Sequence, residues 1–221
     1  MNSRALYTPM QPTNPQTPLL QDMATPKVHR GFYRYLHADS HRTEDTSKFD
    51  NILAKVKATL RQHEGYELFI SGHSLGGALC QLFAFELAAL DDDDIPKPIR
   101  AISFASPQVG HTSYATAFRK LEEAGRLRHL RITNQGDAVP EMPFGFGYTQ
   151  TGVNVHVRHD ATAQVGYGVV KNIVSQTRWN SGDMHSLGVY ENRLFNDWNT
   201  ELLAETMDEL YASEANILPP N

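Results

Sequence analysis

The chain has 221 residues, enough to bury a sizeable core in a single domain. Its formal net charge at pH 7 is −5, and no basic patch marks a nucleic-acid partner. No run of about 18 apolar residues could cross a membrane, and residues 1–8 lack the apolar stretch of a secretory signal. The sequence therefore predicts a cytoplasmic or otherwise intracellular protein with no transmembrane segment, unless a truncated start has removed a signal.

The first 27 residues form a proline-rich segment that we expect to be an extended linker. Prolines cannot donate backbone hydrogen bonds to a continuous strand ladder, and this segment contains Pro9, Pro12, Pro15, Pro18 and Pro26. Residues 28–214 are predicted to form one domain. Residues 215–221, which include Pro219 and Pro220, are predicted to be a disordered tail.

Helix and strand patterns alternate along this domain. Some segments repeat apolar residues at helical spacing, and others are short runs rich in β-branched and aromatic residues. In chain order we expect a helix over 45–63, a strand over 66–71, a helix over 77–87, a strand over 99–104, a helix over 113–123, a strand over 127–133 and a helix near 187–198. This alternation is typical of an α/β fold with a mostly parallel central sheet flanked by helices.

The most informative motif lies between the first predicted strand and the helix after it, and it reads Gly72-His73-Ser74-Leu75-Gly76. Gly-x-Ser-x-Gly at such a junction is typical of a nucleophile elbow, a sharp turn that lifts the serine hydroxyl clear of the sheet. We expect the glycines to let two backbone segments approach closely, so that a bulkier residue at Gly72 or Gly76 would clash. The alternative is a glycine-rich turn without chemistry.

A serine nucleophile requires a base and an acid that orients the base, in the chain order serine, acid, histidine. Asp137 lies in the loop that ends the strand over 127–133 and is the candidate acid, although an aspartate beside glycine is also a common turn residue. His185, in a loop before the last predicted helix, is the best-placed base. His156 and His159 are the alternative bases.

The sequence predicts no metal and no cofactor. The His-x-x-His spacing of His156 and His159 lacks an accompanying cysteine cluster or zinc-binding helix motif. Residues 91–94 are four consecutive aspartates, which we expect to form a solvated loop, because adjacent carboxylates do not provide the spaced ligands that calcium prefers. The single cysteine, Cys80, is expected to be a small buried apolar side chain.

Residues 142–148 follow the candidate acid and combine a methionine and three aromatic residues with glycines. Two interpretations remain open. The apolar side chains could line an acyl groove or touch lipid, or they could pack against the edge of the core, because pocket walls and core edges use the same residue types.

Five short blocks occur in a characteristic order: Val-His-Arg-Gly-Phe at 28–32, Gly-His-Ser-Leu-Gly-Gly at 72–77, Phe-Ala-Ser-Pro-Gln-Val-Gly at 104–110, Asn-Gln-Gly-Asp-Ala-Val-Pro at 134–140 and Asp-Met-His at 183–185. Together they resemble the class 3 (fungal-type) lipases. The resemblance implies an α/β-hydrolase fold and hydrolysis of acyl esters, typically acylglycerols, with a transient lipid interface.

Carried over by position, the resemblance makes Ser74 the nucleophile, Asp137 the orienting acid and His185 the general base, and it makes the backbone N–H of Leu75 an oxyanion donor. These are the residues that the motif and its spacing already favoured. The mechanism implied is an acyl-enzyme on the serine, which water then hydrolyses.

The sequence departs from this family at its beginning. In class 3 lipases a strand ending in an Arg-Gly-Thr or Arg-Gly-Ser motif precedes the Val-His-x-Gly-Phe block and supplies a second oxyanion donor, and no such strand is present here. We therefore expect a fold that lacks the family's first strands, with residues 1–27 as a remnant of the lid region. Three functions stay open: a lipase-type ester hydrolase, a catalytically silent lipase-like binding protein, and an acyltransferase that uses the same residues.

Overall fold

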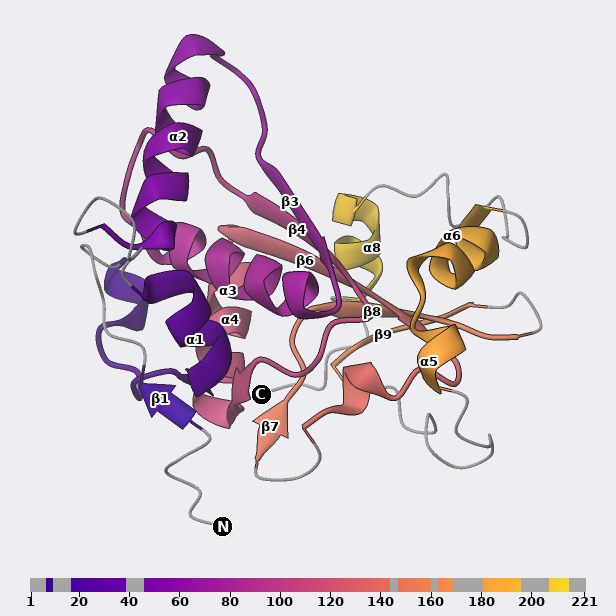
Figure 1. Ribbon diagram of the computed structural model, residues 1–221. Coiled ribbons are helices and arrows are strands. Elements are labelled where there is room, and N and C mark those ends of the chain that lie inside the picture. Colours follow the sequence, from indigo (N-terminus) through magenta and orange to yellow (C-terminus); the bar gives the residue numbers. More distant parts are fainter. Residues whose placement is uncertain are drawn as a thin grey trace.

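The computed structural model describes residues 7–9, 17–38, 46–143, 147–159, 163–168, 181–195 and 207–214. Two sheets organise this part of the chain, and Figure 1 shows the larger one with helices on either side. The predicted tail over 215–221 and the end of the helix predicted near 187–198 lie outside the described residues. No helix among those described is both long and apolar enough to span a bilayer.

The central sheet has five strands in the order β3-β4-β6-β8-β9. Their bounds are β3 Phe69–His73, β4 Ile99–Phe104, β6 Leu127–Asn134, β8 Val153–Val157 and β9 Ala163–Tyr167. The first four strands are mutually parallel, and β9 is antiparallel to β8. The prediction of a mostly parallel sheet is confirmed. Because parallel strands end at the same edge of a sheet, the loops after β3, β4 and β6 gather at one place.

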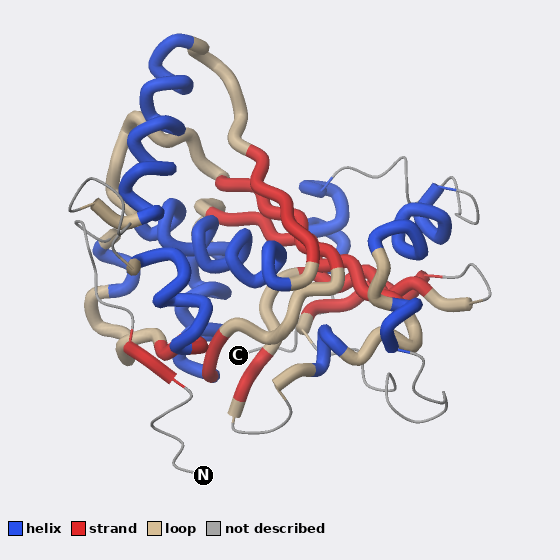
Figure 2. The backbone as a smooth tube through the Cα atoms, in the orientation of Figure 1, coloured by secondary structure: helices blue, strands red, loops and turns tan. Residues whose placement is uncertain are grey.

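Helices cover both faces of this sheet (Figure 1, Figure 2). One face packs against α3 (Leu75–Ala89) and α4 (Thr112–Glu123), and the other packs against α6 (Leu187–Phe195) and α8 (Met207–Glu214). Side chains alternate along β4 and β6, so each strand contributes to two apolar cores. Ala101 and Leu127 belong to the core under α3 and α4, whereas Ile132 and Val155 pack with Tyr190 of α6.

The helix α3 is buried along almost its whole length. It lies between the sheet and two further helices, α1 (Arg30–His37) and α4, so that apolar side chains occupy nearly its whole circumference. Its buried polar side chains have partners: Gln81 Nε2 donates to Ser106 Oγ at 2.6 Å, and Glu86 lies 2.7 Å from His37 Nε2. The helix predicted over 77–87 is confirmed, and α3 extends two residues beyond it at each end.

A second, antiparallel sheet has the strand order β1-β2-β5-β7. Its strands are β1 Tyr7–Pro9, β2 Lys27–His29, β5 Gly110–His111 and β7 Tyr148–Thr149. The linker expected over residues 1–27 is therefore wrong in part, since β1 pairs with β2. A proline is tolerated there because β1 is a short edge strand.

The segment before β2 also packs against the domain. Pro18 begins the short 3₁₀ helix η2 (Pro18–Leu20), a position where a missing amide hydrogen costs nothing. The Thr17 N–H donates to the Ala89 carbonyl at 2.8 Å, and Leu20 is buried. Residues 17–26 thus belong to the folded body rather than to an extended linker.

Most predicted boundaries agree with the structure within a few residues. The helix expected over 45–63 is α2 (Lys48–Gln62), and the strand expected over 66–71 is β3, which begins three residues later and continues through His73. The aspartate run over 91–94 forms a partly exposed loop as expected, and three of its carboxylates also form ion pairs: Asp91 with Arg126, Asp92 with Lys57, and Asp94 with Lys57 and Arg61. The ion pairs of Lys57 and Arg61 hold α2 against the loop.

Within the described residues the central sheet begins at β3, which has a neighbouring strand on one side. The strand β1 lies in the second sheet and does not extend the central one. The elbow strand is therefore at the edge of the sheet in this part of the chain, and Phe69 at its start is 56% exposed.

Candidate active site

The strand β3 passes directly into α3 through Ser74. This residue has a backbone φ of 56°, a conformation that costs a non-glycine residue on the order of 1–3 kcal/mol. Three backbone hydrogen bonds hold it there: its N–H donates to the Phe104 carbonyl at 2.9 Å, and its carbonyl accepts from the N–H groups of Gly77 at 2.9 Å and Ala78 at 3.2 Å. The strand, the sharp turn and the helix that the motif predicts are all present.

The glycines of the turn behave differently from one another. A Cβ added at Gly72 would lie 2.2 Å from the carbonyl oxygen of Gly76, so the predicted clash at Gly72 is confirmed. The prediction for Gly76 is wrong, because a Cβ there would meet nothing within 4 Å. The backbone of Gly76, not its missing side chain, makes the close approach. The second tight position is Gly77, whose Cβ would lie 2.8 Å from Cβ of Ser106.

Asp137 follows β6 after the turn Gln135–Gly136, in which Gly136 has a φ of 92°. Its side chain is buried and has three described partners. Oδ1 accepts from the Val139 N–H at 2.9 Å, and Oδ2 accepts from the Tyr190 hydroxyl at 2.8 Å and from His185 Nδ1 at 3.0 Å. The carboxylate is thus fixed in its orientation toward His185.

His185 lies between the short helix α5 (Ser181–Met184) and α6. Its Nδ1 contacts Asp137, and its Nε2 lies 2.8 Å from Ser74 Oγ. A carboxylate can only accept a hydrogen bond, so Nδ1 carries the proton and the bare Nε2 accepts from the serine hydroxyl. The structure therefore brings Ser74, His185 and Asp137 into one line of hydrogen bonds, in which the imidazole can take a proton from the serine.

Two residues of α6 support this arrangement, and the sequence pattern did not reveal their contacts. The hydroxyl of Tyr190, which is fully buried, donates to Asp137 and accepts from the Asn134 N–H at 3.0 Å. Burial, followed by the charge of Asp137, raises the pKa of Tyr190 well above its usual value, so the hydroxyl remains a donor. Arg193 donates to the Gln135 carbonyl at 3.2 Å and to Met184 Sδ at 3.2 Å. This guanidinium links the loop of Asp137 to the loop of His185.

The two alternative histidines have other partners. His156 lies in β8 with its Nδ1 3.0 Å from Thr133 Oγ1, and burial lowers its pKa to about 4. The ring of His159 contacts Arg193, and its backbone N–H donates to Gln135 Oε1 at 3.0 Å. Among the described residues, no three histidine, cysteine, aspartate or glutamate side chains gather as a metal site would require. Cys80 is buried and its thiol lies 3.2 Å from the Ile70 carbonyl, and burial raises its pKa to about 12.

Exposed apolar side chains flank each of the three site residues. Leu75 follows Ser74 and is 44% exposed, Leu187 lies two residues after His185 and is 55% exposed, and Met142 lies five residues after Asp137 and is 45% exposed. Of the aromatic segment over 142–148, Phe144 and Phe146 lie outside the described residues, and Tyr148 belongs to β7. Each of the three site residues thus has an exposed apolar side chain close to it in the sequence.

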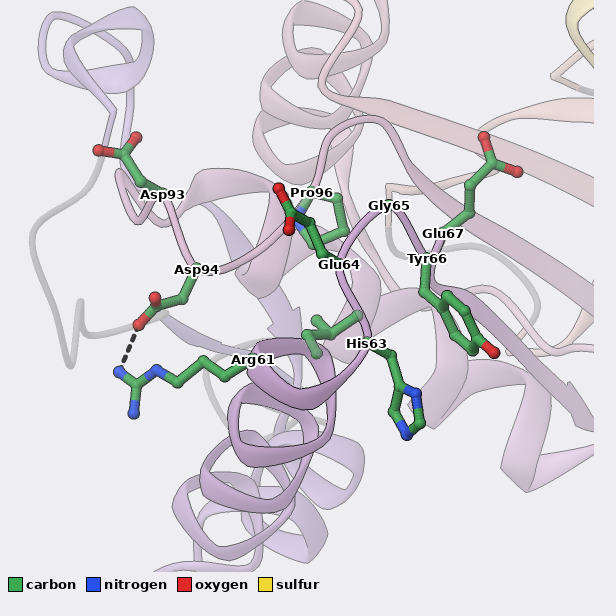
Figure 3. A pocket seen from close by; sticks show the side chains of 10 residues that line it. Arg61, His63, Glu64, Gly65, Tyr66, Glu67, Asp93, Asp94 and Pro96 are labelled. Carbon is green, nitrogen blue, oxygen red and sulfur yellow. Dashed lines mark hydrogen bonds and ion pairs between the residues drawn. The ribbon is translucent and has the colours of Figure 1, made fainter.

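A pocket of about 430 Å³ lies elsewhere, where α2 ends and the chain turns toward β3 (Figure 3). Figure 3 shows Arg61 paired with Asp94 on one side, and His63 and Tyr66, whose rings stack, on the other. The whole of β3 separates this pocket from Ser74, and its lining contains no serine or cysteine. It is not a candidate for nucleophilic chemistry.

Similarity to solved structures identifies the fold. The triacylglycerol lipase from Penicillium expansum superposes with a TM-score of 0.54 at 22% identity, over 73% of this chain and 56% of that one. The Rhizomucor miehei lipase in its propeptide complex gives a TM-score of 0.52 at 20% identity, over 80% of this chain and 50% of that one. The chain has the α/β-hydrolase fold, as the sequence predicted.

A family model described as Lipase (class 3) matches residues 5–146, and the chain belongs to this family. The predicted resemblance is confirmed. The matched region contains Ser74 and Asp137, whereas His185 lies beyond it. Two hydrogen bonds of the His185 imidazole connect it to Ser74 and Asp137 in the structure.

Sequence relatives are plant enzymes by name. The chain is 31% identical over 163 residues to Galactolipase DONGLE, chloroplastic, of Arabidopsis thaliana, which covers 67% of this chain and 31% of the relative. It is 34% identical over 124 residues to Phospholipase A1-II 3 of Oryza sativa subsp. japonica, which covers 52% of this chain and 29% of the relative. The chain spans about a third of the length of the curated relatives it matches.

Proposed function

We propose that this chain is a serine carboxylic-ester hydrolase of lipase type that cleaves acyl esters of lipids. The observation that carries the proposal is the line of hydrogen bonds from Ser74 through His185 to Asp137. Ser74 and His185 are 111 positions apart in the sequence, so this contact is a product of the fold rather than of local spacing. Membership of the lipase (class 3) family supports the same reaction class.

In the first half of the reaction, Ser74 Oγ attacks the ester carbonyl carbon while its proton passes to His185 Nε2. The carbonyl oxygen becomes an oxyanion on a tetrahedral carbon. When the intermediate collapses, the bond from carbon to the alcohol oxygen breaks, and His185 returns the proton to the leaving alcohol. Asp137 keeps Nδ1 protonated, orients the ring and stabilises the imidazolium. The acyl group is left on Ser74.

In the second half, water repeats these steps in reverse. His185 Nε2 takes a proton from the water, whose oxygen attacks the acyl carbon, and the collapse of the second intermediate returns the proton to Ser74 Oγ. The products are a free fatty acid and the regenerated serine. An alcohol in place of water would give an acyl transfer with the same residues.

The oxyanion requires a donor near Ser74, and we assign this role to the backbone N–H of Leu75. Leu75 is the first residue of α3, and the first N–H groups of a helix have no acceptor within it. The positive end of the helix dipole lies at the same place. One such donor is worth about 3 to 4 kcal/mol of transition-state stabilisation.

Lipid esters are the substrate class that the site favours. The exposed apolar side chains of Leu75, Met142 and Leu187 lie beside the three site residues in sequence and offer surface for acyl chains. The curated relatives are named for galactolipids and for phospholipids, and one structural neighbour is named for triacylglycerols. We place polar glycerolipids first, because the named galactolipase and phospholipase A1 are the relatives with higher sequence identity.

The test is hydrolysis of p-nitrophenyl butyrate and p-nitrophenyl palmitate by the purified chain, with Ser74→Ala alongside. We expect Ser74→Ala to lose activity to background, a fall on the order of 10⁶-fold in kcat for a full enzyme of this type. Ser71→Ala is the matched control, because it makes the same change within β3, three residues upstream of Ser74. Full activity in Ser74→Ala would overturn the proposal.

A fluorophosphonate probe separates an active serine from a silent lipase-like binding protein. An activated Ser74 is labelled covalently, whereas a folded chain whose serine is not labelled would be a binding protein. Release of fatty acid from galactolipid, phospholipid and triacylglycerol vesicles then ranks the substrates. Product analysis with an added acceptor alcohol measures how much acyl transfer accompanies hydrolysis.

A further inference from the structure

We propose that His73 is a positioning residue that holds the loop of His185 in register with Ser74, an inference that rests on the proposed function of those two residues. His73 Nε2 lies 2.8 Å from the backbone carbonyl oxygen of His185. A carbonyl can only accept, so His73 carries its proton on Nε2 and donates it across 112 residues of sequence. The residue directly before the nucleophile is therefore bonded to the backbone of the base.

The ring of His73 adds a second contact to the hydrogen bond. Its centroid lies 4.8 Å from that of the His185 ring, at an interplanar angle of 38°. It also meets the ring of Tyr190 edge to face, at 6.0 Å and 78°. His73 thus touches both the base and the tyrosine that holds Asp137.

The loop of His185 depends on such contacts because burial does not fix it. None of residues 182–187 is buried, and α5 before His185 has four residues. By contrast, His73 belongs to β3, whose backbone pairs with β4 along its whole length. The hydrogen bond from His73 therefore connects the loop of His185 to the strand that leads directly into Ser74. A displacement of about 1 Å between reacting groups can cost about 100-fold in rate.

Two substitutions separate the hydrogen bond from the ring contact. His73→Phe keeps a ring and removes the donor, whereas His73→Gln restores an N–H donor without the ring. We expect His73→Phe to lower kcat for p-nitrophenyl butyrate about tenfold, with KM changed less than about twofold, because one hydrogen bond is worth about a factor of ten. We expect His73→Gln to recover kcat to within about threefold of the wild type.

The matched control is His63→Phe. His63 stacks on Tyr66 at 4.8 Å, beyond the other end of β3, so the same change there tests for a general effect of losing a stacked histidine. We expect its kcat and KM to match the wild type. Wild-type kcat in His73→Phe, equal losses in His73→Phe and His73→Gln, or a change in KM alone would overturn the positioning role.

A spectroscopic measurement tests the inference independently of turnover. The Nδ1 proton of His185, which Asp137 binds, should give a distinct downfield NMR resonance in the Ser74→Ala chain. We expect this resonance to broaden or vanish when His73→Phe is added, and to return with His73→Gln. A resonance that is unchanged by both substitutions would overturn the inference. If the wild type shows no Ser74-dependent turnover, the proposed function fails, and this resonance still decides whether His73 positions the loop.

Discussion

The elbow of β3 and α3 and the two loops that hold Asp137 and His185 are built on different physical principles. At the elbow, backbone meets backbone: Gly72 has no room for a Cβ, and the helix behind Ser74 is buried nearly throughout. In the loops, side chains reach across the site and hydrogen bonds set the geometry. The Asp137 side chain is fully buried, whereas 23% of the His185 side chain is exposed, so the base is more accessible to solvent than the acid.

Substitutions in these two regions should therefore have different consequences. At the elbow the fold and the site depend on the same close backbone contacts, so a substitution that introduces a clash there should unfold the chain. A hydrogen bond across the site contributes little to the total stability but fixes the distance between reacting groups. Changes in the loops should therefore lower kcat while the chain stays folded.

The largest effect is expected from Gly72→Ala. Its new Cβ would lie 2.2 Å from the Gly76 carbonyl oxygen, a backbone atom that cannot move without breaking the elbow. We expect the free energy of unfolding to fall by more than about 4 kcal/mol, which for a domain of ordinary stability leaves little folded protein. Urea unfolding followed by circular dichroism measures this change.

Gly76→Ala is the contrasting variant at the same turn. Its Cβ meets nothing within 4 Å, and alanine is the better helix former, so stability should be unchanged or rise by up to about 1 kcal/mol. If the two variants were equally destabilised, the close approach of Gly72 to Gly76 would not be what shapes the elbow.

The next effect concerns how the free energy of unfolding depends on pH through the buried side chain of His156. Burial, followed by the charges of Arg158, Arg131 and Arg193, lowers the pKa of His156 to about 4 from its usual 6.5. Between these values the unfolded chain binds a proton that the folded chain does not, so this contribution to stability is full above pH 6.5 and is lost as the pH falls toward 4. The difference is worth about 3 kcal/mol.

His156→Asn should remove that dependence, because an asparagine nitrogen can lie near the position of Nδ1 and does not titrate. We expect wild type and variant to have similar free energies of unfolding at pH 8, within about 1 kcal/mol. At pH 4.5 the variant should be relatively more stable by about 2 to 3 kcal/mol. Urea unfolding at a series of pH values measures both, and parallel curves for the two proteins would contradict the assignment.

The same contrast explains what could be predicted from the sequence. The elbow, its serine and the alternation of strands and helices follow from short patterns, because steric fit and burial select residue types at fixed local spacing. The loop of Asp137 was found in the same way, from its place after a strand. Each of these features is determined by residues that lie close together in the sequence.

Contacts between distant segments left no comparable signal. Tyr190 falls within the helix predicted near 187–198, and nothing in the sequence indicates that its hydroxyl donates to Asp137. The sequence motif predicts a clash for a side chain at Gly76, but only the folded backbone shows that Gly77 is the position without room for a Cβ. The strand Tyr7–Pro9 was missed because a rule about continuous ladders does not exclude a three-residue edge strand.

The smallest effect is expected from Tyr190→Phe, which tests the loops alone. The substitution keeps the buried ring and removes the hydroxyl that donates to Asp137 and accepts from the Asn134 N–H. We expect kcat to fall about tenfold with KM nearly unchanged, because the carboxylate loses one of its two side-chain partners and can rotate away from His185. The raised pKa of Tyr190 keeps the hydroxyl protonated, so the ratio between wild type and variant should be the same at pH 7 and pH 9.

Tyr114→Phe is the matched control for this last change. Tyr114 is equally buried, on α4, and its hydroxyl donates to the Gln81 carbonyl at 3.4 Å, away from the three site residues. Both variants lose one buried hydroxyl and should lose similar stability, about 1 kcal/mol. Only Tyr190→Phe should lose kcat. Equal kcat in the two variants would mean that Asp137 is held by its backbone contacts alone, and that the loop is as rigid as the elbow.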